Sequence, residues 1–259
     1  MWRPDGWDVT GRIGVLTPHA DVGPESELRA MAPNGVGVHA SRVEFGAMRA
    51  GGGMDPTIPL EPVRAFARPP HVDRAAELLA GAPLQVIAFG FTSSGYLLGA
   101  DGEAEMIDRL EGRTGGIPVV ATCTAALRAL RMLEARSIVL LDPPWFDEDL
   151  NASGARFFTG EGFDVVHHAP CGVRSDQRAV TPAGLYEWIR GNVPAGVDAL
   201  FIGGNGFRAV GVIEALEEAL GCAVLTANQV LFWHALRRGR ISLPVSGYGR
   251  LFDLDGPTA

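Results

Sequence analysis

The chain has 259 residues, a length that suits one large domain or two small ones and that can bury a full core. Its composition is ordinary for a globular protein, with 47% hydrophobic and 20% charged residues. The net charge of −8 argues against binding to nucleic acid or to an anionic lipid surface, although local dipoles can still hold an anionic metabolite.

Neither end of the chain nor its cysteines indicate secretion. The N-terminus is polar and lacks the apolar segment of a signal peptide, and no apolar run approaches the ~20 residues that span a bilayer. The three cysteines, Cys123, Cys171 and Cys222, are an odd number without metal-like spacing. We therefore expect a reduced, cytoplasmic protein with no membrane partner. The sequence has no dinucleotide fingerprint, P-loop or metal-ligand cluster, so we expect no cofactor and no metal.

In the first half of the chain, apolar segments alternate with amphipathic ones. The expected strands are Arg12–Thr17, Gly35–Val43 and Leu84–Phe89. The expected helices are Glu25–Met31, Val72–Ala80 and Gly102–Glu111. Residues Gly51–Pro62 are rich in Gly and Pro and predict a loop that could serve as a mobile flap.

The second half repeats this order. The expected strands are Ile117–Ala121, Ser137–Leu141, Asp164–His168, Ala199–Ile202 and Val224–Thr226. The expected helices are Thr124–Ala135, Asp147–Gly160, Pro182–Asn192, Arg208–Leu220 and Asn228–Arg238. Alternating strands and helices predict an α/β fold with parallel sheets, here two pseudo-symmetric lobes, each a short parallel sheet flanked by helices. We assign residues 1–115 and 229–259 to the first lobe and 116–228 to the second, with the site in the interlobe cleft.

Two loops in matching positions of the two halves are the first candidates for a binding site. Thr92, Ser93 and Ser94 supply hydroxyls and amides at a predicted helix N-terminus, which either cradles a carboxylate or only caps the helix. Gly204, Asn205 and Gly206 follow the strand Ala199–Ile202 and form either an anion-binding nest or a tight turn.

Titratable residues follow other predicted strands. His19 and Asp21 come after the first strand, where either could act as a general acid or base; the alternative is that Asp21 caps the next helix and His19 is exposed. Cys123 begins a predicted helix, which would lower the pKa of its thiol, but a lone cysteine is also a common buried residue. Trp145 could wall the pocket or simply pack.

The motifs together resemble the aspartate/glutamate racemase superfamily, in its maleate isomerase and arylmalonate decarboxylase branch. The resemblance runs from Gly11 to about Phe252 and rests on the order and spacing of short segments rather than on one motif. These segments are Gly11–Pro18, Glu25, Ala32–Val36, His39–Arg42, Thr92–Ser94, Ile117–Val120, Ala129–Leu130, Gly203–Arg208, Thr226–Trp233 and Gly247–Leu251. It implies two pseudo-symmetric α/β lobes, an interlobe site for a small carboxylate and no cofactor, and it also allows for a homo-oligomer.

The family's two catalytic cysteines are missing at the matching positions. Phe91 precedes Thr92 where one cysteine belongs, and Gly204 stands in place of the other. Asp21 matches the substrate-binding asparagine of the isomerases, and Trp145 roughly matches their pocket tyrosine. The racemase, isomerase and decarboxylase mechanisms therefore do not transfer unchanged.

The leading hypothesis is a cofactor-independent decarboxylase, lyase or isomerase that forms an enediolate-like intermediate without the cysteine pair. Thr92, Ser93 and the amides of residues 204–206 would stabilise the charge, and Phe91 and Trp145 would desolvate the departing carboxylate. Asp21 or His19 would move the proton. The alternatives are a thiol enzyme that uses Cys123, and an inactive homologue that only binds a ligand.

Overall fold

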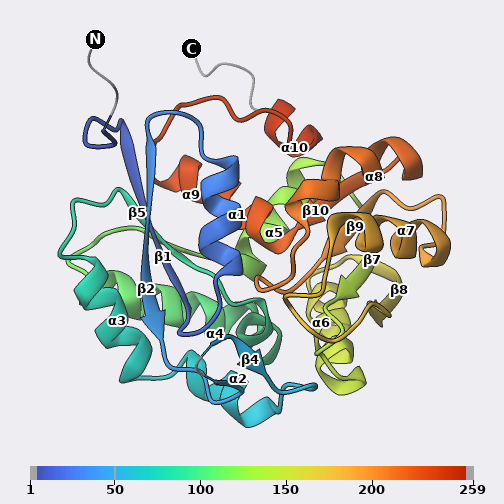
Figure 1. Ribbon diagram of the computed structural model, residues 1–259, viewed down its shortest axis with the longest axis horizontal. Helices are drawn as coiled ribbons and strands as arrows, with labels where there is room; N and C mark the ends of the chain where they lie inside the picture. The colour runs from blue at the N-terminus through green and yellow to red at the C-terminus, as the bar shows by residue number, and fades with distance from the viewer. Residues whose placement is uncertain (1–4, 50, 255–259) are drawn as a thin grey trace.

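The computed structural model describes residues 5–49 and 51–254. Two four-stranded sheets, all parallel within each sheet, form the framework, and Figure 1 shows them side by side. The first sheet has the order β2-β1-β5-β6, and the second has the order β10-β9-β7-β8. Both sheets have the same topology. In each, the second strand in chain order (β2 or β8) lies at the edge beside the first (β1 or β7), and the third (β5 or β9) pairs with the opposite side of the first. The predicted fold class is confirmed.

The strands of the first sheet are β1 (Gly11–Pro18), β2 (Val36–Val43), β5 (Val86–Phe89) and β6 (Val119–Ala121). Those of the second sheet are β7 (Ser137–Asp142), β8 (Asp164–Pro170), β9 (Ala199–Ile202) and β10 (Ala223–Thr226). β5, β6, β9 and β10 are buried along their whole length, which explains their unbroken apolar sequences. β8 lies at an edge and is partly exposed.

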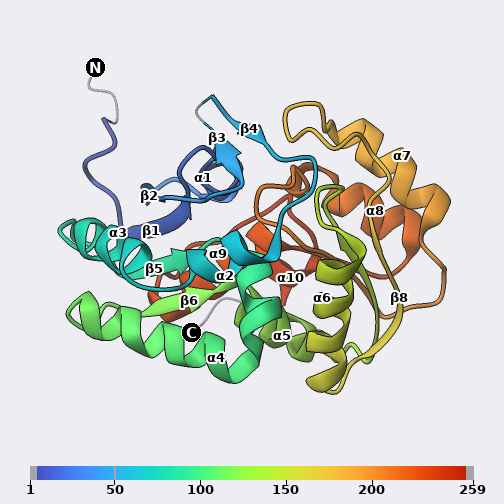
Figure 2. The ribbon, with the colours of Figure 1, turned by 90° about the horizontal axis from the view of Figure 1, so that it is seen from below.

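The helices alternate with the strands along most of the chain and cover the sheets. Figure 2 shows them from below. In the first half they are α1 (Gly23–Met31), α2 (Leu60–Phe66), α3 (His71–Leu79), α4 (Thr92–Arg113) and α5 (Thr122–Met132). In the second half they are α6 (Glu148–Gly160), α7 (Pro182–Asn192), the short 3-10 helix η1 (Val210–Val212), α8 (Ile213–Leu220), α9 (Ala227–Arg238) and α10 (Arg250–Asp253). None of the described helices is long and apolar enough to cross a membrane.

The lobe boundary predicted at residue 116 is wrong for one strand. β6 pairs with β5 and so completes the first sheet, whereas we expected this strand in the second lobe. Hydrophobic pattern alone does not specify which neighbour a parallel strand chooses, because β6 is equally apolar on both faces. The predicted return of the last long helix is found, since α9 contacts both β5 and β6.

The Gly- and Pro-rich segment after β2 is more ordered than a plain loop. β3 (Met48–Arg49) and β4 (Gly53–Met54) pair as a small antiparallel hairpin, and α2 begins at Leu60. Pro62 lies in the first turn of α2, where a backbone N–H would have no partner within the helix, so this proline does not break it.

The helix predicted over Gly102–Glu111 is only part of α4. α4 begins at Thr92, so the first candidate loop, Thr92–Ser94, is the first turn of this helix, and α4 bends at Gly99, whose φ is 73°. A φ of this sign is unfavourable for most residues other than glycine. The kink allows the first turns of α4 to lie at the interlobe site while the rest of the helix covers the first sheet.

The contact between α4 and α6 depends on a glycine. A Cβ atom at Gly154 would lie 2.6 Å from Tyr96 Cε2, whereas a Cβ at Gly160 of the same helix would meet no atom within 4 Å. We predict that Gly154→Ala lowers the free energy of unfolding by about 1–3 kcal/mol through overpacking. Gly160→Ala should raise it by up to about 1 kcal/mol through helix propensity. Urea denaturation of both variants checks this; an equal effect of the two substitutions would contradict the packing.

Candidate functional site

The candidate site is a pocket at the carboxyl ends of the two inner strands of each sheet. Its lining comes from the segments that follow β1, β5, β7 and β9, together with the β3–β4 region and the β8–α7 loop. In α/β sheets this is the end at which ligands bind. The pocket encloses about 370 Å³ of empty space, open solvent included.

Most of the wall is apolar. The aromatic and sulfur-containing side chains that line it are Phe45, Met48, Met54, Phe91, Trp145 and Phe146. The polar lining consists of Asp21, Thr92, Ser93, Gln177 and Asn205, with Gly204 and Gly206 beside them. Of the predicted site residues, His19, Ser94 and Cys123 do not line the pocket.

Asp21 is the only titratable side chain among the described residues that line this pocket. Its Oδ1 accepts hydrogen bonds from the backbone N–H of Gly23 at 2.8 Å and from the side-chain amide of Gln177 at 2.6 Å. Burial raises the pKa of Asp21 above its ordinary value, and the bonds from Gly23 and Gln177 and the charge of Arg42 oppose this only in part. A carboxyl in this setting is suited to hold and release a proton.

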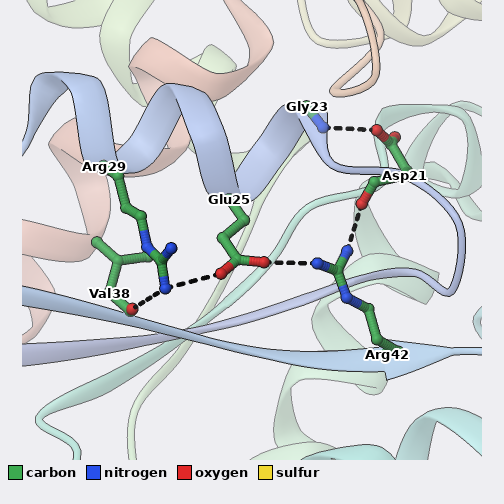
Figure 3. Close-up of polar contacts among 6 residues, drawn as sticks. All are labelled: Asp21, Gly23, Glu25, Arg29, Val38 and Arg42. Carbon is green, nitrogen blue, oxygen red and sulfur yellow. Dashed lines mark hydrogen bonds and ion pairs between the residues drawn. The ribbon is translucent and has the colours of Figure 1, made fainter.

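Ion pairs on the surface fix the loop that carries Asp21, as Figure 3 shows. Arg42 on β2 donates one hydrogen bond to the backbone carbonyl of Asp21 and another to Glu25 at 2.5 Å. Glu25 also pairs with Arg29 at 2.8 Å, within α1. Arg42 thus contacts the main chain of Asp21 rather than its carboxyl group, and among the described residues the carboxyl has no direct cationic partner.

His19 has a different position from the one expected for a proton carrier. Its side chain is exposed, and its Nδ1 accepts the backbone N–H of Phe45 at 3.2 Å. Of the two predicted acid–base residues, only Asp21 is brought into the pocket.

The two matching loops meet, and a single side chain joins them. Asn205 Oδ1 accepts hydrogen bonds from Thr92 N at 2.8 Å, from Thr92 Oγ1 at 2.7 Å and from Thr122 Oγ1 at 3.2 Å. Thr92 Oγ1 in turn accepts the backbone N–H of Gly204 at 3.2 Å. The polar groups of Thr92, the Gly204 amide and the Asn205 carbonyl are therefore engaged with one another rather than free to bind a substrate.

The donors that remain free define a smaller cradle than expected. Among the described residues, the backbone N–H groups of Ser93, Asn205 and Gly206 and the hydroxyl of Ser93 have no hydrogen-bond acceptor. Ser94 does not belong to this set, because its hydroxyl donates to the carbonyl of Val63 at 3.1 Å. Free amides at a helix N-terminus and in a glycine-rich turn favour a carboxylate or an oxyanion.

Cys123 lacks the properties of a reactive thiol. It is fully buried, and its Sγ donates to the carbonyl of Thr92 at 3.4 Å. Burial first, and then the charges of Glu103 and Asp142, raise its pKa well above the ordinary value. The lowering expected from the helix N-terminus is not found, because desolvation and two nearby carboxyl groups outweigh the dipole.

A second buried carboxyl, not expected from the sequence, lies beneath the site. Asp142 at the end of β7 accepts hydrogen bonds from Tyr96 Oη at 3.0 Å and from Asn151 Nδ2 at 2.9 Å. Burial raises its pKa to about 7. Glu27, which accepts from Asn228 Nδ2 and from the amides of Ala209 and Val210, has its pKa raised to about 7 for the same reason. Within the described ranges, no cluster of three or more His, Cys, Asp or Glu side chains could hold a metal ion.

A sequence model of the arylmalonate decarboxylase family matches residues 69–252. This is more than half of the chain. The chain belongs to the arylmalonate decarboxylase family. No curated protein matches the chain.

Solved structures agree with the family in fold. The chain resembles the maleate isomerase of Pseudomonas putida S16 with maleate at a TM-score of 0.81 and 19% identity, over 95% of this chain and 98% of that one. A Nocardia farcinica maleate cis-trans isomerase mutant with a covalently bound succinylcysteine intermediate gives a TM-score of 0.81 at 21% identity, over 95% and 99%. A crystal structure of arylmalonate decarboxylase gives a TM-score of 0.73 at 23% identity, over 93% and 99%. At these identities the similarity shows a shared fold.

Local packing suits Phe91 and Gly204, which stand at the two positions where the family resemblance places cysteines. The ring of Phe91 packs on Phe66 and Phe45, with centroid distances of 4.0 and 4.9 Å. Gly204 has a φ of 79°, and a Cβ atom there would lie 2.4 Å from Pro143 Cγ. The local backbone of this family member therefore excludes a cysteine side chain at 204 unless the loop shifts.

We predict that Gly204→Cys lowers the free energy of unfolding by roughly 2–4 kcal/mol, because it adds backbone strain to overpacking. Gly211→Cys is the matched control, since a Cβ there would meet only Pro182, at 3.8 Å. Chemical denaturation measures both. Wild-type stability of Gly204→Cys would show that the loop adjusts freely.

The buried carboxyl of Asp142 predicts a pH dependence of stability. Its pKa is higher in the folded than in the unfolded state, so the unfolded state releases the proton first and stability falls as pH rises from about 4 to about 7. Asp142→Asn should make this slope shallower by up to ~1.4 kcal/mol per pH unit.

Urea denaturation across this pH range measures the slope. Asp198→Asn is the control. Hydrogen bonds that the exposed Asp198 accepts from Ser137 and Arg136 lower its pKa, so its ionisation changes the stability at lower pH. An unchanged slope in Asp142→Asn would mean that Asp142 is ionised in the folded protein at these pH values.

Proposed function

We propose that the chain is a cofactor-independent decarboxylase, or a related lyase or isomerase, that acts on a small carboxylic acid through an enediolate-like intermediate. The observation that carries this proposal is the position of Asp21, which is the one titratable side chain in the described part of the chain that lines a largely apolar pocket between the lobes. Membership of the arylmalonate decarboxylase family supports the same class of chemistry.

Substrate binding would use the free donors of the two loops. One carboxylate of the substrate would accept hydrogen bonds from the hydroxyl of Ser93 and from the amides of Ser93, Asn205 and Gly206. These are fixed donors in a pocket with little water, where hydrogen bonds to a developing charge are strongest. As the second carboxyl group leaves, the first becomes the enediolate, and the same donors hold the added negative charge.

Bond cleavage would take place at the second carboxylate. This group lacks polar partners when it lies against the apolar wall formed by Phe91, Trp145 and Phe146. An ionised group is costly there, whereas neutral CO₂ is not. The carbon–carbon bond breaks, its electron pair enters the enediolate, and CO₂ departs.

Asp21 would complete the reaction as the general acid. Its carboxyl group donates a proton to the α-carbon of the enediolate, which restores the remaining carboxylate, and Asp21 then recovers a proton from solvent. The raised pKa of Asp21 favours the protonated form that this step needs. The same enediolate chemistry serves an isomerase or another lyase when a different bond breaks.

The two alternatives are less well supported. A thiol mechanism through Cys123 conflicts with the burial of that side chain, its raised pKa and its position outside the pocket lining. An inactive ligand-binding homologue would retain the cradle and would need no protonated Asp21.

We predict that the protein converts one or more small dicarboxylic acids. The test is to incubate it with a panel of malonates and maleate and to follow the products by NMR. Asp21→Asn should lower kcat by roughly 10²–10⁴-fold, the usual contribution of a positioned general acid. His19→Gln, which alters an exposed neighbour, should leave kcat unchanged.

Three results would count against this proposal. Full activity of Asp21→Asn would remove Asp21 from the mechanism. Loss of activity on alkylation of Cys123 alone would favour the thiol alternative. Tight binding of a carboxylate in a thermal-shift screen, without turnover of any member of the panel, would favour the inactive homologue.

A further inference from the structure

The β8–α7 loop, residues 171–181, reaches from the second lobe across the pocket to the first. Ser175 Oγ donates to the carbonyl of Pro56 at 2.9 Å, next to the β3–β4 hairpin. Gln177 from the same loop lines the pocket and contacts Asp21. No motif in the sequence indicates a role for this loop, and the mechanism above does not use it.

The side-chain amide of Gln177 joins the acid to the cradle. Its Nε2 carries two hydrogens, and it donates to Asp21 Oδ1 at 2.6 Å and to the backbone carbonyl of Gly206 at 2.8 Å. Both N–H groups of this nitrogen are thus used, one to an acceptor in the first lobe and the other to an acceptor in the second. Asp21 and Gly206 are 185 residues apart in sequence, and Gln177 links them directly.

The pattern of donors on Asp21 specifies which oxygen carries its proton. Oδ1 receives two N–H groups, from Gly23 and Gln177, whereas Oδ2 has no hydrogen-bond partner among the described residues. An oxygen that accepts two hydrogen bonds is a poor site for a proton, so the protonated carboxyl has its O–H at Oδ2. Oδ2 is also the oxygen near Gly206, since a Cβ atom on that glycine would lie 2.7 Å from it.

We infer that Gln177 is a positioning residue that orients the carboxyl group of Asp21, with Oδ2 as the proton-donating oxygen, when the β8–α7 loop is seated. This rests on the proposed function in so far as Asp21 is the acid. The same nitrogen ties the acid to the turn whose free amides are placed to hold the substrate.

The test compares two substitutions in one loop. Gln177→Met keeps the length of the side chain and removes its N–H groups, whereas Ser175→Ala removes the bond to Pro56 and leaves Asp21 untouched. The first measurement is the pKa of Asp21 itself, from the ¹³C carboxyl resonance that disappears in Asp21→Asn. Because a bond from Gln177 favours the ionised form, its loss should raise this pKa in Gln177→Met and leave it unchanged in Ser175→Ala.

The second measurement is the pH dependence of turnover on any substrate found in the panel. Gln177→Met should lower kcat roughly tenfold, the order expected when one hydrogen bond to a catalytic group is lost, with a smaller effect on KM. The alkaline limb of its pH profile should move upward with the pKa of Asp21.

The outcomes separate this inference from the proposed function. An unchanged pKa of Asp21 in Gln177→Met, or an equal rise in Ser175→Ala, would overturn the positioning role. A rise in the pKa confined to Gln177→Met would support that role even if Asp21→Asn retained full activity, and in that case the proposed function alone would fail.

Discussion

The structure of the site depends on the hydrogen bonds that converge on Asn205. Its side-chain carbonyl accepts three donors from the loops after β5 and β6, and its side-chain amide donates to Asn228 at the start of α9. The side-chain amide of Asn228 donates to the backbone carbonyl of Asn205 and also to Glu27 on α1. These buried side chains join both sheets and the crossing helix, and a network of this kind is stable only if each member is satisfied.

Within each loop, some polar groups join the two lobes and others stay free for a ligand. Thr92 and the Asn205 side chain hold the lobes together, so they are not available to a ligand. Their neighbours Ser93 and Gly206 retain free donors, which lie at a helix N-terminus and in a turn. In each loop one side chain thus joins the lobes while nearby N–H groups stay free, among them the backbone N–H of Asn205 itself, which an alignment of the two motifs alone does not reveal.

The second constraint is the absence of a cationic side chain from the described lining of the pocket. Asp21, Asp142 and Glu27 are all buried with raised pKa values, and hydrogen bonds rather than salt bridges satisfy them. Neutral carboxyls are the expected state in such surroundings. Asp21 differs from the other two in lining the pocket, and the proposed proton transfer rests on this difference.

Much of the fold could be predicted from the sequence, because buried parallel strands such as β5 and β9 read as short apolar runs between amphipathic helices. The placement of β6 could not, since strand order is a long-range property. For the site, the position of Asp21 followed from the end of β1, and the meeting of the two loops followed from the repeat. Gln177 lies in a loop of no regular pattern, and its role arises only from contacts across 156 positions of sequence. For Cys123 the sequence left a lowered pKa and plain burial open, and burial prevails because the desolvation and the neighbouring carboxyls arise from tertiary packing.

A neutral Asp21 beside a bound carboxylate is most directly detected as proton uptake. Calorimetric titration with the small carboxylate that gives the largest rise in melting temperature, in buffers of different ionisation enthalpy, measures the protons bound per ligand. Over the pH range in which the protein stays folded, we predict an uptake that grows above the pKa of Asp21 and is lost in Asp21→Asn. Binding without proton uptake over the whole range, or the same uptake in Asp21→Asn, would contradict a protonated Asp21 beside the bound carboxylate.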